Sequence, residues 1–518
     1  MELSLANWLI GVAPIALVLI LMMKLRWQGS YAGLAAWVSA LILAALFFGA
    51  DFRVLFYGSV KGAWTTVFVL YIIWGALTLY HIVNQVSGFK TIAGHIAKWT
   101  GGSKLIQLLV VGWTFPSLIQ GVCGFGTPVA VAAPLLVGLG FPPILATTTA
   151  LIGHSWAVTF GTLGSSYAVM LKLTALDAAQ LALYSSIFIS VSCLLAGLII
   201  LWNYRKLSSE RRIFSEGLPS VLLLAITMIA GTLVTANLVS PFIASLVAGM
   251  LGLTVGCFIL PQAPWYSKSG PNNYETPSQS FHVAFSAYYI LIAIVFLIYL
   301  TPLKGWLDTF QFGPPFPATT TKFGFVNPAV DMYSPIKYFT APGTLIFLSA
   351  SIAVKVYQRY NLWKRGMLRA IAANVVRDAL PASLTVISMS MLSVVMVETG
   401  MMALIAEGIA SFSAHSYPLF ASLVGGLGAF MTGSNTSSNI LFSVFQMNVA
   451  EIIGMNALVI LGLQTTGGAI GNMFSPLNIA LGTSVTNSIG AEGQILGRTL
   501  FPGIIACLVV GLLGLLII

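Results

Sequence analysis

"GFGTPVAVAAPLLVGLG" (124–140) places glycines and a Thr-Pro pair at the head of a stretch that is otherwise apolar. A second run, "TGSNTSSNILFSVF" (432–445), does the same in the other half of the chain. Glycine and proline disfavour a continuous helix, and short Ser, Asn and Thr side chains bond to nearby backbone groups. The sequence therefore breaks two apolar segments, and the fold class follows from the reason for these breaks.

The composition indicates an all-α polytopic membrane protein. Of the 518 residues, 58% are hydrophobic and only 7% are charged, which is too few to cover a soluble protein of this size. The net charge of +10 lies in short loops between apolar segments, so it sets membrane topology rather than nucleic-acid binding. The first apolar run, 8–23, has no small-residue cleavage site and is predicted to be a span. The four cysteines and five histidines form no ligand cluster, so we expect no metal or cofactor.

Span lengths give the predicted layout. A membrane helix needs about 20 apolar residues. Twelve segments meet this criterion, and two other apolar segments, 104–141 and 417–450, are broken in the middle. From 127 to 140 a helix would be only about 21 Å long, short of a hydrocarbon core of about 30 Å, so we expect re-entrant hairpins. The twelve predicted membrane helices are 8–27, 31–49, 63–87, 143–175 (interrupted), 179–204, 217–235, 240–262, 284–301, 340–357, 377–397, 455–490 (interrupted) and 497–518.

The two halves of the chain have the same order of elements. Gly433 follows Gly126, and Gly468 follows Gly161, at the same separation of 307 residues. Each hairpin is preceded by a full span and a short amphipathic segment, and is followed by an interrupted helix and a final span. The predicted division is a first repeat (1–216, with hairpin 104–141 and broken helix 143–175), linking helices (217–283) and a second repeat (284–518, with hairpin 417–450 and broken helix 455–490).

The distribution of positive charge gives the orientation of the repeats. If Lys24 and Arg26 are cytoplasmic, 17 of the 23 Lys and Arg residues lie inside, five lie outside and Lys172 lies in a span. The first hairpin then enters from the cytoplasm and the second from the opposite side, so the repeats are inverted. Inverted repeats with interrupted helices are typical of secondary transporters, which hold substrate and ions near the bilayer midplane.

The broken segments supply the candidate binding residues. The turn at 433–439 exposes backbone N–H groups at the start of a half-helix, where the partial positive charge favours a carboxylate. In the alternative interpretation, the Gly, Ser and Thr residues of these segments bind nothing and only let the membrane helices pack closely. The predicted substrate-binding residues are Gly124, Phe125, Gly126, Thr127, Gly161, Ser434, Asn435, Thr436, Ser437, Ser438, Asn439, Thr465 and Thr466.

Ionisable residues inside a membrane are functional candidates because burying them is costly. His154 lies in the middle of a predicted span, where it either relays a proton or forms a neutral hydrogen bond between helices. Asp378 and Glu398 flank another predicted span, and we expect both at its surfaces.

Three stretches resemble the signature segments of the bacterial lactate permease family: "GVCGFGTPVAVAAPLLVGLGF" (121–141), "FMTGSNTSSNILF" (430–442) and "QTTGGAIGNMFSPLNIA" (464–480). The resemblance implies an importer of L-lactate, D-lactate or glycolate, and these permeases are described as proton symporters. This chain has Gln120 where the family carries glutamate and Asn435 where it carries aspartate. Neither amide can titrate, which argues against proton coupling through these two side chains. The coupling candidates are Gln120, where the chain departs from the family, and His154.

A second similarity keeps the choice of coupling ion open. Ser434-Asn435-Thr436 resembles the tip motif of sodium-coupled dicarboxylate symporters, whose elevator fold has paired inverted hairpins. The resemblance implies an elevator mechanism, with spans 240–262 and 284–301 in a scaffold that could form a homodimer.

The sequence thus predicts a symporter of the bacterial plasma (inner) membrane that imports small 2-hydroxy monocarboxylates such as lactate or glycolate. Proton coupling follows from the family resemblance. The alternatives are a sodium-coupled carboxylate symporter and a uniporter or exchanger of small organic anions. A passive channel would need a continuous polar path. An enzyme would need a nucleophile and a base that face each other, which the helical neighbours His154 and Ser155 do not do, so we expect no enzyme.

Overall fold

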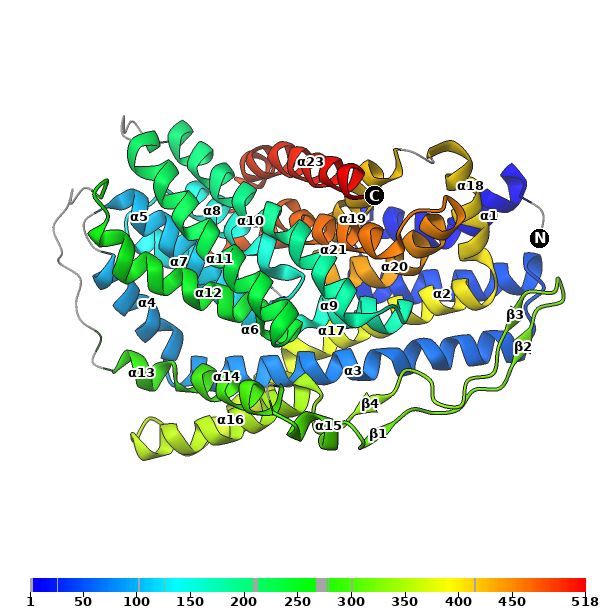
Figure 1. The fold of residues 1–518 in the computed structure, drawn as a ribbon, viewed down its shortest axis with the longest axis horizontal. Helices are drawn as coiled ribbons and strands as arrows, with labels where there is room; N and C mark the ends of the chain where they lie inside the picture. Colours follow the sequence, from blue (N-terminus) through cyan, green and yellow to red (C-terminus); the bar gives the residue numbers. More distant parts are fainter. Residues whose placement is uncertain are drawn as a thin grey trace.

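Long helices run roughly along the longest axis of the molecule, as the computed structural model shows (Figure 1). Four strands of two residues each, β1 (Gln311–Phe312), β2 (Thr319–Thr320), β3 (Val326–Asn327) and β4 (Ile336–Lys337), lie in one loop and pair as β1–β4 and β2–β3. The predicted helical fold class is therefore confirmed. The structure describes residues 3–25, 27–100, 103–124, 126–207, 213–266, 277, 279–299, 301–413 and 416–518.

The first half of the chain forms ten α-helices with two short turns of other helix types, a π-helical turn (Val110–Thr114) and a 3₁₀ turn (Trp156–Val158). The α-helices are α1 (Leu5–Met23), α2 (Gly29–Phe47), α3 (Phe52–Gln85), α4 (Gly88–Trp99), α5 (Lys104–Leu109), α6 (Phe115–Val122), α7 (Thr127–Gly138), α8 (Pro143–Ser155), α9 (Gly161–Thr174) and α10 (Ala178–Leu207).

The remaining helices link the halves and form the second half. The linking elements are π-helical turns at Ile213–Gly217 and Val255–Ile259, 3₁₀ turns at Pro241–Ile243 and Leu260–Gln262, α11 (Leu218–Leu238), α12 (Ala244–Thr254), α13 (Phe281–Ala284), α14 (Ser286–Tyr299), α15 (Leu303–Leu307) and α16 (Pro342–Arg359). The second half comprises α17 (Met367–Glu398), α18 (Met401–Ser413), α19 (Tyr417–Thr432), α20 (Asn435–Ile452), α21 (Ala457–Gly471), a 3₁₀ turn (Asn472–Phe474), α22 (Pro476–Val485) and α23 (Glu492–Ile517).

Both apolar segments that the sequence breaks fold as helix–turn–helix hairpins. Hairpin 1 consists of α5, the π-helical turn, α6 and α7, and hairpin 2 consists of α19 and α20. Gly126 (φ 79°) and Gly433 (φ 68°) occupy the left-handed region at the two turns, which is open to glycine at little cost. Ser434 then caps α20, because its Oγ accepts a hydrogen bond from the Ser437 N–H. The predicted interruptions are therefore located correctly.

The two predicted interrupted helices are also interrupted in the structure. The first consists of α8, the 3₁₀ turn and α9, and the second consists of α21, its 3₁₀ turn and α22. The elements α3 to α10 and α17 to α23 thus follow one order: long helix, short helix, hairpin, broken helix, long helix. Hairpin 1 lies in the left half of the molecule and hairpin 2 in the right half (Figure 1).

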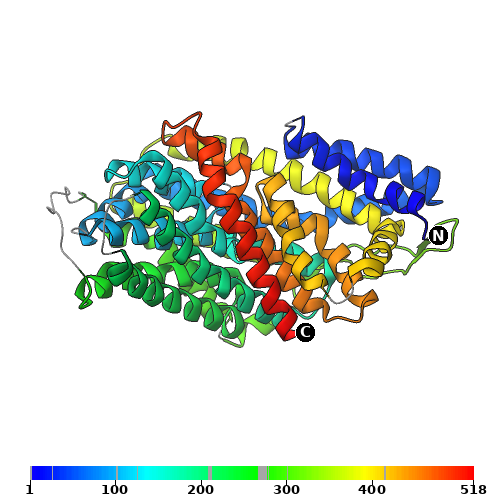
Figure 2. The ribbon, with the colours of Figure 1, turned by 90° about the horizontal axis from the view of Figure 1, so that it is seen from above.

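The helices pack as two groups. The scaffold group contains α2, α3, α16 and α17, with α3 and α17 packed along each other, and α14 packs on α16. The hairpin group contains both hairpins, both broken helices, α10 to α12 and α23 (Figures 1 and 2). Small residues let α12 approach α6: a Cβ on Gly249 would lie 2.5 Å from the Leu118 Cα, and one on Gly121 would lie 2.5 Å from the Leu246 Cα. The structure therefore packs 240–262 against hairpin 1, and the predicted scaffold role of this span remains a prediction.

Ten helical segments of the described chain are long and apolar enough to cross a membrane. Nine of them coincide with predicted spans, and the tenth, Lys104–Val122, is the first arm of hairpin 1. The predicted spans 143–175, 284–301 and 340–357 are not among the ten. The first of these is divided into α8 and α9, of 13 and 14 residues, and α14 has only 14 residues.

A buried ion pair ties the scaffold together. Lys61 of α3 is 2% exposed, and its Nζ lies 2.9 and 3.0 Å from the carboxylate oxygens of Glu398, at the end of α17. Asn327 of β3 donates a hydrogen bond to the Glu398 carbonyl (2.8 Å), and the Lys61 ammonium lies 5.6 Å from the ring centroids of Phe316 and Tyr333. The loop that holds the strands thus covers the pair. The expectation of a surface position for Glu398 is wrong, because the pairing makes its burial possible.

We predict that Lys61→Met lowers the free energy of unfolding by about 3–5 kcal/mol, because it leaves a buried carboxylate without its partner. Lys337→Met is a matched control, since Lys337 pairs with Asp308 at a similar distance (2.8 Å) but is 46% exposed, and exposed pairs contribute about 1 kcal/mol or less. The thermal unfolding midpoint of the purified protein measures both. Equal midpoints for the two variants would contradict a stabilising role for the buried pair.

Candidate functional site

A polar cavity lies where the two hairpin turns and the two helix breaks meet. The empty space around the residues that line it, counted out to open solvent, is about 370 Å³. Both repeats contribute to its wall. The lining residues are Gln120, Gly124, Gly126, His154, Val158, Thr162, Ser166, Gly433, Ser434, Asn435, Thr436, Asn472 and Asn478.

Four half-helices begin at this cavity. They are α7, α9, α20 and α22, and each has a lining residue at its cap or in its first turn. Backbone N–H groups at a helix N-terminus have no partner in the helix and carry partial positive charge. Among the described residues, none of those that line the cavity is a lysine, arginine, aspartate or glutamate. The cavity can therefore attract an anion through main-chain dipoles and neutral polar groups.

The break in the first broken helix has an unusual backbone. Thr162, Leu163 and Gly164 all have left-handed conformations, with φ values of 50°, 49° and 74°. Two of these residues carry side chains, for which this region costs about 1–2 kcal/mol each. The Thr162 Oγ1 accepts a hydrogen bond from the Gly124 N–H (2.9 Å), which ties the turn of hairpin 1 to the broken helix. Backbone strain of this kind is common at functional sites, where the surrounding structure maintains it.

The side chains of hairpin 2 bond across the break. Asn435 Nδ2 donates to the Thr465 carbonyl (3.0 Å), and Asn439 Nδ2 donates to the Ser166 carbonyl (3.0 Å) and to Thr465 Oγ1 (2.9 Å). The hydroxyls of Thr436 and Ser166 lie 3.0 Å apart, which links the two repeats directly. These contacts leave several buried acceptor oxygens without a donor among the described residues: Asn435 Oδ1, Asn439 Oδ1, Thr466 Oγ1 and Ser475 Oγ.

Two side chains of the first repeat present polar groups to the cavity. Gln120 is 3% exposed, and the structure assigns its amide no hydrogen bond to any described residue. A Cβ on Gly161 would lie 2.7 Å from Gln120 Nε2, so this glycine makes room for the amide. His154 is also 3% exposed, and its Nδ1 lies 2.9 Å from the Ala150 carbonyl oxygen.

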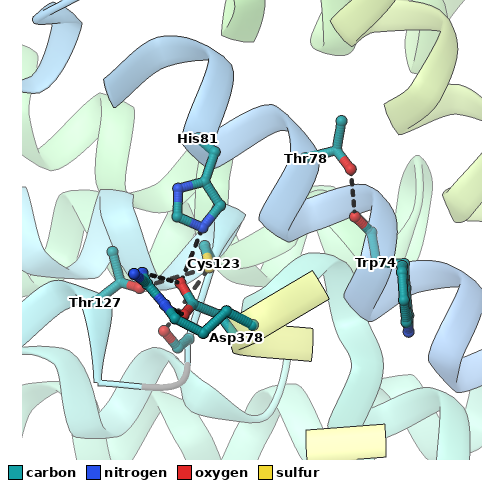
Figure 3. A network of polar contacts seen from close by, with 8 residues as sticks. Trp74, Thr78, His81, Cys123, Thr127 and Asp378 are labelled. Atoms are coloured by element: carbon teal, nitrogen blue, oxygen red, sulfur yellow. Dashed lines mark hydrogen bonds and ion pairs between the residues drawn. The ribbon is translucent and has the colours of Figure 1, made fainter. Parts of the chain in front are cut away.

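A second polar network lies beside the turn of hairpin 1 (Figure 3). His81 Nε2 of α3 lies 2.9 Å from Asp378 Oδ2 of α17, and Arg377 Nε lies 2.8 Å from the other carboxylate oxygen. The Cys123 Sγ lies 3.6 Å from the Thr127 hydroxyl at the same turn. Asp378 is 35% exposed, and it pairs with a histidine that is only 7% exposed.

The structure brings seven of the predicted site residues to the cavity wall: Gln120, Gly124, Gly126, His154, Ser434, Asn435 and Thr436. Others lie behind it, namely Thr127, Gly161, Ser437, Ser438, Asn439, Thr465 and Thr466, several of which position the residues in front. Phe125 lies outside the described residues. Ligand binding by these residues remains a prediction.

The sequence prediction missed five lining residues, Val158, Thr162, Ser166, Asn472 and Asn478, while Gly433 belongs to the predicted turn 433–439. Asn472 and Asn478 carried a usable signal, since both are amides in an apolar segment just after a break. Asn478 Nδ2 donates to the Asn472 carbonyl (3.1 Å), which orients the two residues together. Among the described residues there is no cluster of three or more His, Cys, Asp or Glu that could hold a metal ion.

Comparison with known proteins gives full-length relatives. An L-lactate permease of Halalkalibacterium halodurans is 26% identical over 513 residues, which covers 95% of this chain and 93% of the relative. A glycolate permease of Escherichia coli is 25% identical over 556 residues, covering 98% of this chain and 95% of the relative. Among solved structures, the YdaH transporter of Alcanivorax borkumensis superposes with a TM-score of 0.47 at 13% identity, covering 89% of this chain and 86% of that one.

The family model for L-lactate permeases matches residues 7–518, which is nearly the whole chain. The match contains both hairpins, both broken helices and every residue that lines the cavity. Together with the membrane-crossing helices, it confirms the predicted family and the predicted multi-pass location in the bacterial inner membrane. The chain belongs to the L-lactate permease family.

Proposed function

We propose that this protein is a secondary active symporter that imports small 2-hydroxy monocarboxylates, such as lactate or glycolate. The observation that carries the proposal is the cavity itself, where four helix N-termini meet and no charged side chain of the described residues lines the wall. The relatives named for L-lactate and glycolate support the choice of substrate.

The cavity suits a single small carboxylate. An anion near a helix N-terminus is stabilised by about 0.3–1 kcal/mol at an exposed site, and by up to about 2 kcal/mol when partly buried. Several such ends act together here, with the hydroxyls of Ser434 and Thr436 as further donors. The small enclosed space between the hairpin turns favours a compact acid over a long-chain or polycyclic one.

The packing suggests how the site is exposed to each side of the membrane. The hairpin group encloses the cavity, and the scaffold group of α2, α3, α16 and α17 lies along one side of it. Movement of the hairpin group against the scaffold would carry the substrate across the membrane. Rigid-body movement of one bundle against another around a fixed site is the usual route to alternating access in transporters with inverted repeats.

Protons are the proposed coupling ion because of the family resemblance, and His154 is the titratable side chain of the described cavity wall. Sodium is a second candidate, favoured by the buried oxygens of Asn435, Asn439, Thr466 and Ser475, for which no described residue serves as a donor. Unwound carbonyls and neutral oxygens at helix breaks are typical sodium ligands in transporters.

Uptake of labelled lactate into proteoliposomes tests the proposal. A proton gradient, acidic outside, and a sodium gradient are imposed separately, each with the membrane potential clamped. We expect saturable uptake that only the proton gradient drives above equilibrium. Stimulation by sodium alone would favour the second candidate. Saturable exchange that neither gradient stimulates would indicate a uniporter or exchanger, and no saturable lactate transport at all would contradict the proposed function.

Gln120→Glu tests whether position 120 contributes to coupling. The substitution places a titratable carboxyl at the cavity wall, so we expect uptake to fall as the pH rises, because the ionised form repels the substrate carboxylate. Gln120→Leu is the control, with similar size and no titration, and it should lower the rate without adding a pH dependence. The measurement is the pH profile of lactate counterflow. Identical pH profiles for the two variants would show that position 120 does not contribute to coupling.

Thr162→Val tests the tie between hairpin 1 and the broken helix. Valine has the same branched shape but leaves the Gly124 N–H without its acceptor, a loss of about 1–3 kcal/mol. We expect the KM for lactate to rise about ten-fold or more, because the turn that closes the cavity is no longer held. Thr162→Ser keeps the hydroxyl and should stay near the wild-type value. A valine variant with wild-type KM would show that this bond does not shape the site.

A further inference from the structure

One ring nitrogen of His154 forms a hydrogen bond with a backbone carbonyl. His154 lies in the last turn of α8, and its Nδ1 is 2.9 Å from the Ala150 carbonyl oxygen, one helical turn earlier. A carbonyl oxygen only accepts hydrogen bonds, so the Nδ1 must carry the hydrogen. In the neutral ring the Nε2 is then an acceptor with a free lone pair.

The free nitrogen belongs to a side chain of the cavity wall. His154 is 3% exposed, and no described residue donates a hydrogen bond to its Nε2. Gln120 and Thr162 line the same cavity. A neutral imidazole in this tautomer differs from the hydroxyl and amide groups around it, because its Nε2 accepts and cannot donate. It therefore fits a ligand group that carries a hydrogen.

A 2-hydroxy acid has such a group beside its carboxylate. The carboxylate only accepts hydrogen bonds, and the helix N-termini at Gly126 and Ser434 supply donors for it. The adjacent hydroxyl has one hydrogen to donate, and it needs an acceptor once water is excluded. Val158, which follows His154 by four residues in the same wall, supplies an apolar surface for a small methyl group.

We infer that His154 is the specificity-determining residue that recognises the 2-hydroxyl group of the substrate, by accepting its hydrogen bond at Nε2. The inference rests on the proposed function, since it assigns one residue to one part of that substrate class. A site built to bond a hydroxyl rejects the analogue that lacks it, because a buried polar group would lose its partner. A pocket that only matches size and charge does not discriminate in this way.

The test compares acids that differ only at carbon 2, with the full-length protein in proteoliposomes. Lactate, propionate (no hydroxyl) and pyruvate (an oxo group that cannot donate) compete with labelled lactate in counterflow. For the wild type we expect propionate and pyruvate to inhibit about 10- to 100-fold more weakly than lactate. In His154→Leu the lactate constant should rise to that of propionate, while the propionate constant changes little.

Two further variants separate recognition from general disturbance. His154→Gln offers an amide oxygen in place of Nε2 and should restore part of the preference for lactate. Ser117→Ala is the matched structural control. The Ser117 hydroxyl lies within hydrogen-bond distance of the carbonyls of Trp113 (2.7 Å) and Gly153 (3.0 Å), and it accepts from the Trp156 Nε1–H (2.9 Å). These bonds lie beside His154, and Ser117 does not line the cavity. The alanine variant should lower the unfolding midpoint and leave the ratio of lactate to propionate inhibition unchanged.

The outcomes distinguish this inference from the proposed function. If the wild type transports lactate but binds propionate and pyruvate equally well, the inference fails and the function stands. An unchanged lactate preference in His154→Leu also overturns it, including the case in which only the proton stimulation is lost, since that result makes the residue a proton relay. If the leucine variant does not fold, the wild-type ratios and the glutamine variant decide the question. Absence of lactate transport by the wild type defeats the proposed function itself.

Discussion

The need to satisfy backbone groups away from water governs this structure. A helix that stops inside a membrane leaves N–H and C=O groups without partners, and each such group costs several kcal/mol in hydrocarbon. Helices are interrupted at four places near the centre of the molecule: at the turns of hairpins 1 and 2 and at the breaks after α8 and α21. The breaks are tolerated because each is covered by the others: Thr162 accepts the Gly124 N–H, and Asn435 bonds to the Thr465 carbonyl. The matching order of elements in the two halves brings these ends together at one place.

The same arrangement determines what the cavity can attract. Helix starts concentrate partial positive charge, so an anion is stabilised without a buried lysine or arginine, which would be costly to desolvate. The described part of the wall can therefore stay free of formal charge. The ion pair Lys61–Glu398 lies instead in the scaffold, between α3 and α17, under the loop that holds the strands. A pair of formal charges thus holds α3 and α17 together, whereas helix dipoles face the cavity where a ligand can bind.

The sequence predicted the parts of the fold that depend on local chemistry. Glycine, proline and short polar residues mark the breaks, so both hairpins and both broken helices were located from the sequence. Contacts between residues far apart in the sequence could not be predicted. No pattern near Glu398 indicates a partner 337 residues away, and no pattern in 240–262 indicates that its small residues pack against α6. The candidate site was predicted in part for the same reason. Thr162 was missed because a left-handed threonine is set by tertiary packing, and Thr465 was assigned to the wall although it supports Asn435 from behind.

The central claim is that the hairpin turns cradle a small carboxylate with main-chain groups rather than with a cationic side chain. A crystal structure with 3-bromolactate, located by the anomalous signal of the bromine, tests this claim most directly. We expect one bound molecule in the cavity between Gly124, Gly126 and 434–436, with its carboxylate within hydrogen-bond distance of backbone N–H groups at the start of α7 or α20. A carboxylate held by a lysine or arginine side chain, or a bromine site at the periphery of the hairpin group, would contradict it.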